Sequence, residues 1–312
     1  MEKDFLKKVK RLKWGAKGTP IIIAVIISFL ILIVLFFGVM AWGIYKLNWR
    51  GGIMDKFLEV MPLPAAKVDR NYILFPDYLK ALSAAEKFYA KQQEKGFKNI
   101  PTHDELQKIV MEERLVQNIL VKEISAKYNI TVSQEEINDN ANEVLNNAGG
   151  EEKFKTFLND FYGISIQDYK KIFIEPNLYF DKTNEAIIDD ESINGAAKKK
   201  IQEALSKLRN GEKFEDVVRA YSEDLQANEN ASQEFFMRGE LPKDIEDQLF
   251  AIAEGKYTDV LTMTDSYTIF KLLKKDEDKG SLITQKIIVK IKTLSDLLKE
   301  QKEKAQIEIY AY

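Results

Sequence analysis

The feature that most constrains this chain is a run of twenty-five residues without a formal charge, Ile21–Tyr45. About 20 apolar residues span the hydrocarbon core of a bilayer, so the run is long enough to cross a membrane with some tilt. Trp42 and Tyr45 lie near its far end, where aromatic rings favour the headgroup region. No polar face interrupts the run, which argues against a buried helix of a soluble protein. We therefore predict a transmembrane anchor over residues 21–45.

Positive charge is concentrated before this run. Residues 1–20 contain seven lysine and arginine residues against two acidic ones, and only Lys46 and Arg50 follow the run closely. The positive-inside rule then predicts a cytoplasmic basic tail and extracytoplasmic main domains. A cleaved signal peptide would have a shorter apolar core and a small-residue cleavage site, which Val39–Gly43 does not offer. We expect an uncleaved, single-pass anchor in the plasma (inner) membrane.

The remaining composition excludes several classes of function. Residues 51–312 carry a net charge of −10, which argues against nucleic acid as a partner because phosphate binding needs a basic surface. The chain has no cysteine, so disulfides, thiolate nucleophiles and zinc–cysteine sites are excluded. His103 is the single histidine and falls in the first turn of a predicted helix, where we expect a surface residue. We predict no metal site and no cofactor.

The segment after the anchor divides into a tether and a helical module. Residues 46–66 contain Gly51, Gly52 and two prolines, and we predict a tether with a short helix in it. Residues 67–190 form the predicted module, beginning with a strand over Val68–Leu74 and continuing almost entirely as helix. Capping boxes at Thr102–Glu105 and Ser133–Glu136 begin two of its helices. A last helix begins at Ser165 and is expected to end before Pro176.

Residues 191–294 have a different pattern, in which helices mix with antiparallel strands. Helices are predicted over 198–210, 214–221 and 242–253, and a short strand at 234–238. Alternating residues predict a hairpin of Thr258–Met263 with Tyr267–Leu273, and a further strand at Lys286–Lys292. A helix at 295–304 and a strand at Ile307–Tyr312 follow, and the segment 295–312 could complete the helical module. The predicted fold class is α+β: one transmembrane helix, a mostly helical module and a small antiparallel-sheet domain.

Two stretches carry a resemblance to known families. KKIQEALSKLRNGEKFEDVVRAYSED (199–224) and FFMRGELPKDIEDQLFAIAEGKYTDVLTMTDSYTIFKLLKK (235–275) resemble a parvulin-type (PpiC-like) peptidyl-prolyl isomerase domain. LVQNILVKEISAKYNITVSQEEI (115–137) and YGISIQDYKK (162–171) resemble the helical chaperone module of SurA- and PrsA-like foldases. The resemblance covers about two thirds of the chain and rests on the order of the motifs.

The chain also departs from the parvulin pattern. The family has two facing histidines, one on the first strand and one on the last, and the last-strand position here is Thr268. The first strand is missing before residue 196, and KIIVK (286–290) matches it better. The resemblance thus implies a rearranged strand order, with Lys286 in place of a histidine. Asp224 is kept at the position of the family's Cys or Asp, whereas Ala231–Glu234 has lost the glycines of the family's glycine-rich strand.

Isomerisation of an X–Pro bond needs no nucleophile, because the barrier of roughly 18–20 kcal/mol comes from lost amide resonance. It needs an apolar socket for the proline ring and polar groups that favour the twisted amide. The predicted socket residues are Leu241, Ile245, Phe236 and Phe250. The predicted polar residues are Asp224, Thr268, Lys286 and Thr262. Ile245 and Phe250 could equally be core residues at helical spacing, and Asp224 could cap the following loop.

Three functions remain open from the sequence. The first is a membrane-anchored foldase that binds unfolded or proline-containing polypeptides and isomerises X–Pro bonds. The second is a non-catalytic holdase or assembly chaperone with a degenerate parvulin-like domain, since both histidine positions are replaced. The third is a structural membrane protein whose helical domain recruits a fixed partner. Whether the protein is an isomerase and whether it forms a homodimer stay open at this point.

Overall fold

The computed structural model describes residues 18–47, 49, 52–224 and 233–311 of the chain. The chain divides into two compact units. The first contains the residues up to Lys80 together with Ile307–Tyr312, and the second contains Ala81–Gln306. The first unit therefore unites two segments that are distant in sequence.

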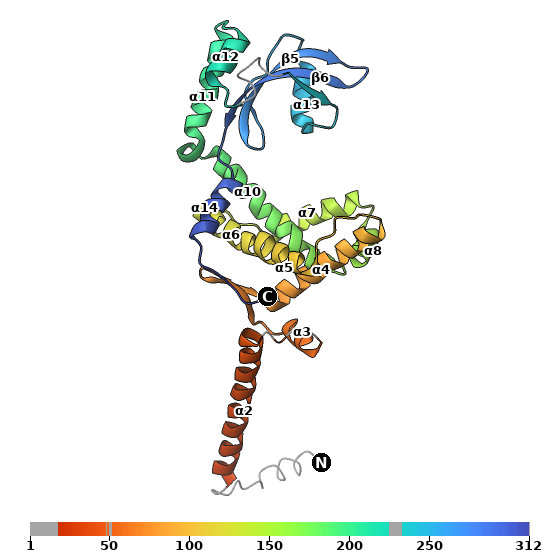
Figure 1. The fold of residues 1–312 in the computed structure, drawn as a ribbon, viewed down its shortest axis with the longest axis vertical. Helices are drawn as coiled ribbons and strands as arrows, with labels where there is room; N and C mark the ends of the chain where they lie inside the picture. The colour runs from red at the N-terminus through yellow and green to blue at the C-terminus, as the bar shows by residue number, and fades with distance from the viewer. Residues whose placement is uncertain (1–17, 48, 50–51, 225–232, 312) are drawn as a thin grey trace, which may run out of the picture. The chain divides into compact units, whose positions relative to one another are not determined.

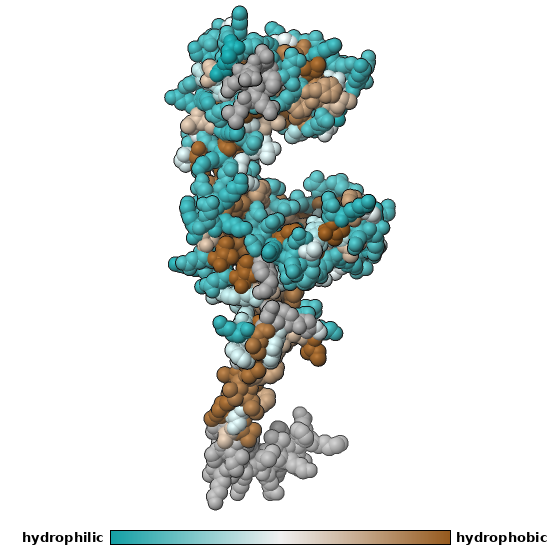
Figure 2. Space-filling view, in the orientation of Figure 1, coloured by the Kyte–Doolittle hydropathy of each residue, from teal (hydrophilic) through white to brown (hydrophobic). Residues whose placement is uncertain are grey.

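The first unit begins with the helix α2 (Gly18–Lys46), which covers the predicted anchor (Figure 1). Its segment Ala24–Lys46 has a hydropathy of 3.0 and is long and apolar enough to cross a membrane. Exposed apolar side chains, brown in Figure 2, cover this helix. A helix that is apolar on every side is suited to lipid rather than to water. Most of the predicted basic tail, residues 1–17, lies outside the described residues.

The last turn of α2 belongs to the core of the first unit. Ile44 is only 1% exposed. The Tyr45 hydroxyl donates a 2.9 Å hydrogen bond to the carbonyl of Pro64. The Tyr45 ring also meets Tyr310 edge-on, with the ring centroids 5.6 Å apart. The apolar helix and the folded unit are thus one piece of structure where they join.

A three-stranded antiparallel sheet in the order β2-β1-β7 completes the first unit. Its strands and the short helix before them are α3 (Ile53–Leu58), β1 (Pro64–Val68), β2 (Asn71–Leu74) and β7 (Ile307–Ile309). The single strand predicted over Val68–Leu74 is wrong. Asp69 has a φ of 50° and turns the chain into a β1–β2 hairpin, in a conformation that Asp tolerates. The predicted return of the last strand is confirmed, because β7 pairs with β1.

The range 46–66, predicted as a tether, holds α3 and the start of β1. Leu58 and Ala65 are fully buried in it. The segment therefore contributes to the core of the first unit, in addition to connecting the anchor to the rest of the chain.

Helices dominate the chain from residue 75 to residue 189, as predicted. They are α4 (Phe75–Glu94), α5 (His103–Lys108), η1 (Ile109–Val116), α6 (Gln117–Lys127), α7 (Gln134–Asn147), α8 (Glu151–Phe161), α9 (Ile166–Tyr169), η2 (Lys170–Ile174) and α10 (Glu175–Asp189). The capping boxes at Thr102 and Ser133 are both present. The predicted helix end before Pro176 is wrong, because α9, η2 and α10 follow one another without a break. The chain passes Pro176 after a π-helical turn, in which the backbone bonding changes to i→i+5.

The remainder of the second unit contains a four-stranded antiparallel sheet in the order β3-β6-β5-β4. Its elements are α11 (Glu191–Arg209), α12 (Phe214–Tyr221), β3 (Glu234–Met237), α13 (Lys243–Ala251), β4 (Leu261–Thr262), β5 (Ser266–Asp276) and β6 (Ser281–Lys290). The strand predicted at Lys286–Lys292 is confirmed as central in this sheet, although it begins earlier and ends at Lys290. The predicted hairpin partner Thr258–Met263 is reduced to the two residues of β4.

Each face of this sheet has its own apolar core. Ile201 of α11 and Val218 of α12 pack with Ile269 and Ile287 on one face, and all four are fully buried. On the other face, helix α13 packs Leu249 against residues of β4, β5 and β6. Figure 1 shows α11 and α12 on one side of the strands and α13 on the other. The strict alternation of β6 supplies side chains to both cores.

The buried side chain of Asn194 on α11 joins the end of β6 to the helices. Its amide donates 2.9 Å hydrogen bonds to the carbonyls of Ile187 and Lys292, and its oxygen accepts a 2.8 Å bond from the Lys292 N–H. Beyond this junction, α14 (Leu294–Lys304) packs against α6 and α10. Leu294 is fully buried, and its N–H donates a 2.9 Å bond to Asn184. The chain therefore returns from the sheet to the helices.

Candidate active site

One face of the four-stranded sheet carries several of the predicted site residues. Side chains alternate between the two faces of a strand, and directly paired residues share a face. Lys286 pairs with Phe270, which lies two residues after Thr268, and Phe236 pairs with Leu282. Phe270 and Leu282 pack in the core that contains α13. Thr268, Lys286 and Phe236 therefore lie on the face that α13 partly covers.

The predicted apolar socket forms one cluster with α13: Leu241, Ile245, Phe236 and Phe250. Ile245 is only 4% exposed, which makes it a core residue of this cluster. The other three are half-buried and can contact a ligand. The Arg238 guanidinium lies over the Phe250 ring, 3.8 Å from its centroid, and adds a cation to the edge of this apolar surface.

The polar residues of this face are already engaged with neighbours. Lys286 forms an ion pair with Glu234, and their side chains are 20% and 32% exposed. Thr268 is 1% exposed, and its hydroxyl lies 3.2 Å from that of Ser266. The position that resembles the first-strand histidine thus holds an ammonium bound to a carboxylate. The position that resembles the last-strand histidine holds the buried hydroxyl of Thr268.

Asp224 follows a segment that borders β6. The Glu223 N–H donates a 2.7 Å bond to the Ile288 carbonyl, and the Ile288 N–H donates a 3.1 Å bond to the Ser222 hydroxyl. Burial alone would raise the pKa of Glu223, but hydrogen bonds from Lys200 and from the Lys290 N–H hold it below its usual range. Asp224 itself is half-buried at this edge of the sheet. The stretch predicted to replace the glycine-rich strand, 231–234, has its first two residues outside the described residues, and Glu234 begins β3.

Thr262 and His103 lie away from this face of the sheet. Thr262 pairs with Tyr267, which packs in the opposite core, and its side chain is exposed. The structure therefore does not bring Thr262 together with Lys286. His103 is a surface residue, as predicted, with its side chain 60% exposed and its ring 2.6 Å from Glu86.

Glu234 and Glu223 were not predicted as site residues, although both border the site. Glu234 and Phe236 are two residues apart on β3, so the sequence pattern places the two on one face. What the pattern does not give is the register of β3 against β6, in which Glu234 lies opposite Thr284 and within reach of Lys286. Because β6 was predicted as a central strand, Lys286 was expected to have neighbours on both adjacent strands. The acidic residue Glu234 on the neighbouring strand β3 was the signal that could have predicted the ion pair.

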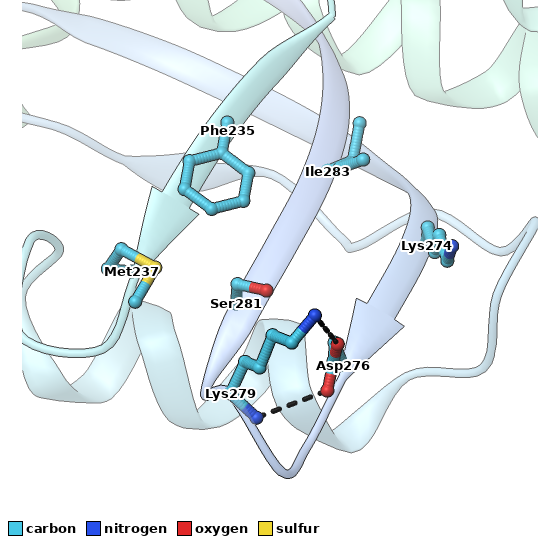
Figure 3. A pocket seen from close by; sticks show the side chains of 7 residues that line it. All are labelled: Phe235, Met237, Lys274, Asp276, Lys279, Ser281 and Ile283. Atoms are coloured by element: carbon cyan, nitrogen blue, oxygen red, sulfur yellow. Dashed lines mark hydrogen bonds and ion pairs between the residues drawn. The ribbon is translucent and has the colours of Figure 1, made fainter.

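The opposite face of the same strands has a separate hollow of about 310 Å³. It is lined by Phe235, Met237, Lys274, Asp276, Lys279, Ser281 and Ile283. Figure 3 shows the apolar side chains of β3 on one side and the Asp276–Lys279 pair on the other. The residues that β3 and β6 contribute to this hollow alternate with those that face α13, so the hollow is distinct from the predicted site.

The helical part of the second unit has a polar hollow of its own. It measures about 160 Å³ and lies where η1 and α6 meet η2 and α10, with Arg114, Gln117, Asn118 and Asn177 among its lining residues. The Arg114 guanidinium lies 4.3 Å from the centroid of the Phe173 ring. Burial lowers the pKa of Arg114, because the charged form loses hydration. π-helical turns such as η1 and η2 occur often at functional sites.

Family models match both parts of the chain. A model described as "SurA-like N-terminal domain" matches residues 12–173, more than half of the chain. The protein belongs to this SurA-like family. A model described as "PPIC-type PPIASE domain" matches residues 180–274, so a parvulin-type domain follows the SurA-like domain. The predicted resemblance is confirmed. The second match ends before β6, so the central strand of the sheet lies outside the matched segment.

Curated relatives of this SurA-like protein are foldases. It is 28% identical over 189 residues to "Foldase protein PrsA 3" of Bacillus cereus, which covers 56% of this chain and 65% of the relative. It is 27% identical over 213 residues to "Foldase protein PrsA 1" of Listeria innocua, covering 68% of this chain and 58% of the relative. The chain thus spans less than two thirds of the length of these relatives.

Solved structures of PrsA proteins are similar to parts of the SurA-like protein. Peptidylprolyl isomerase PrsA from Bacillus anthracis aligns with 61% of this chain and 86% of its own, at 16% identity and a TM-score of 0.22. Foldase protein PrsA from Streptococcus pneumoniae aligns with 67% and 81%, at 18% identity and a TM-score of 0.21.

Proposed function

We propose that the protein is a membrane-anchored extracytoplasmic foldase. In this proposal α2 crosses the membrane, residues 67–190 with α14 bind unfolded polypeptides, and residues 191–294 isomerise X–Pro bonds. The foldase relatives and the PPIC-type match support the class of function. The single observation that carries the site is the half-buried apolar surface of Phe236, Leu241 and Phe250. This surface lies on the same face of the sheet as the ion pair of Lys286 with Glu234.

The geometry suits the elementary requirements of the reaction. A proline ring bound on Phe236, Leu241 and Phe250 would leave water, while the amide would face the polar border of the sheet. Asp224 at that border is the polar group proposed to favour the twisted amide over the planar one, in which resonance is intact. Lys286 contributes through its pair with Glu234, which fixes a cation next to the apolar surface.

Substitution at this face is the direct test of catalysis. We expect Asp224→Ala and Leu241→Ala to lower the proline-isomerisation rate of the full chain by about tenfold each, which corresponds to about 1.4 kcal/mol of transition-state stabilisation. His103→Ala is the matched control and should leave the rate unchanged, because this residue lies on the surface of the helical module. The rate is measured on a proline-containing peptide, with the thermal midpoint of each variant recorded alongside.

The same experiment distinguishes the second candidate function, a non-catalytic holdase. The pairing of Lys286 with Glu234 and the burial of Thr268 favour this alternative, since neither offers a free polar group to the amide. A wild-type chain that suppresses aggregation of an unfolded client but does not isomerise proline would support the holdase. An activity loss caused by His103→Ala alone would contradict the site.

The proposed topology has its own test. We expect protease added to spheroplasts to digest the region after α2, while an epitope placed before residue 18 stays protected until the membrane is opened. The reason is the excess of lysine and arginine before the apolar helix. Digestion of the amino-terminal epitope alone would show that the orientation is reversed.

A further inference from the structure

Exposed large apolar side chains are concentrated just after the apolar helix. Leu47, Trp49, Ile53 and Val60 are 48%, 38%, 89% and 74% exposed. In the rest of the described chain beyond Val60, the exposed large apolar side chains are Tyr72, Phe97, Phe157, Phe235 and Met237. A soluble surface carries such residues singly, so four of them within fourteen residues indicate a surface that is covered in the native setting.

The helix α3 separates an outward apolar side from a buried one. Ile53, Phe57 and Val60 follow the i, i+4, i+7 spacing, and the chain continues past α3 in a turn in which the Val60 N–H donates a 3.3 Å bond to the Phe57 carbonyl. Leu58 points the other way and is fully buried. Packing inside the first unit therefore accounts for Leu58 but leaves Ile53 and Val60 without a cover.

The position of this surface relative to the apolar helix is fixed by packing. The Trp49 ring lies so close to Gly43 that a Cβ at position 43 would overlap it, so a larger residue there would displace the ring. Tyr45 is tied to Pro64 and Tyr310 in the same unit. Figures 1 and 2 show α3 beside the end of α2, with apolar side chains on both. The surface therefore lies next to the end of the segment proposed to cross the membrane.

We infer that Leu47, Trp49, Ile53 and Val60 form a juxtamembrane surface that inserts into the headgroup region of the lipid bilayer. The inference rests on the proposed membrane anchoring, because continuity with α2 identifies the bilayer as the occupant. Tryptophan and aliphatic side chains on an amphipathic segment are the residues that bury at this depth. Residues 46–60 contain three cations (Lys46, Arg50, Lys56) and two anions (Asp55, Glu59), a net charge of only +1, so the contact depends mainly on apolar area and should occur on zwitterionic lipid.

The chain offers a clean labelling test because its sequence contains no cysteine. The full chain is reconstituted in phosphatidylcholine vesicles with an environment-sensitive fluorophore at a single cysteine. Ile53→Cys and Val60→Cys should give blue-shifted emission that nitroxide-labelled lipids quench. Glu59→Cys, the exposed neighbour of Val60, and Phe235→Cys, an exposed apolar residue of the second unit, are the matched controls and should give aqueous emission.

A further variant separates this inference from the proposed anchoring. Val39→Cys lies within α2 and is 56% exposed in the isolated chain, so lipid quenching at this position reports insertion of the helix. No quenching at Val39 would refute the anchoring itself. Quenching at Val39 together with aqueous emission at Ile53 and Val60 would overturn the juxtamembrane surface alone. Oxidative cross-linking of Ile53→Cys into dimers without lipid quenching would assign the surface to a second copy of the chain and would overturn it as well.

Discussion

Deleting residues 283–312 is expected to abolish cooperative unfolding of the four-stranded sheet. The deletion removes nearly all of β6, the strand between β3 and β5. It takes Ile287 and Val289 out of the core under α11 and α12, and it leaves the long strand β5 with an open edge. A sheet without its central strand has two separated parts, and a short hairpin is marginally stable at best. Thermal and urea unfolding, followed by circular dichroism, measure the effect.

Two milder changes serve as controls for this deletion. Removing residues 306–312 takes away β7 alone and should leave the transition of the second unit in place. Ile287→Ala keeps the strand and should lower the free energy of unfolding by about 2–5 kcal/mol, because the side chain is fully buried. A deleted chain that keeps the wild-type midpoint and cooperativity would contradict the assigned architecture.

The second large effect is expected from Asn194→Leu. The substitution keeps the approximate volume of the side chain but removes its bonds to Ile187 and to both backbone groups of Lys292. Each buried polar group left without a partner costs about 1–3 kcal/mol. We therefore expect a clear loss of stability in the second unit, measured by urea unfolding.

The matched control for this substitution is Asn210→Leu at the exposed end of α11. It should change the free energy of unfolding by no more than about 0.5 kcal/mol, as is usual for surface positions. Equal stabilities of the Asn194 and Asn210 variants would show that the junction between β6 and the helices contributes little.

Local sequence signals predicted much of this fold. Thr102, Ser133 and Ser165 begin helices because each is followed three residues later by a side chain that completes a capping box. The alternation of KIIVK predicted a strand, and the lack of a first strand before residue 196 predicted its central place. The capping boxes depend on residues within a few positions of each other. The place of the KIIVK strand follows from the open edge that the sheet would have without it.

Features set by distant contacts were harder to predict. The turn at Asp69 splits a stretch whose apolar pattern is typical of a single strand, and the return of the last strand was predicted but its register against β1 was not. Leu261 and Thr262 point to opposite faces because they are adjacent on a strand, but which of the two faces α13 follows from the register of β4 on β5. The Lys286–Glu234 pair likewise depends on how β3 aligns with β6. In each case the missing information is the strand register, which short-range patterns do not carry.

The pairing of β1 with β7 has a consequence for the order of events during synthesis. Ala66 lies opposite Ile309, so the sheet of the first unit cannot be completed until residues more than 240 positions further along the chain have left the ribosome. Contacts between such distant residues form slowly because the intervening loop must first be closed. Until then, β1 presents an unpaired edge on a nascent chain whose apolar helix has already emerged. Completion of this sheet therefore shows that synthesis has passed Ile309, and a product that ends before this residue keeps an open edge that proteases and chaperones can recognise.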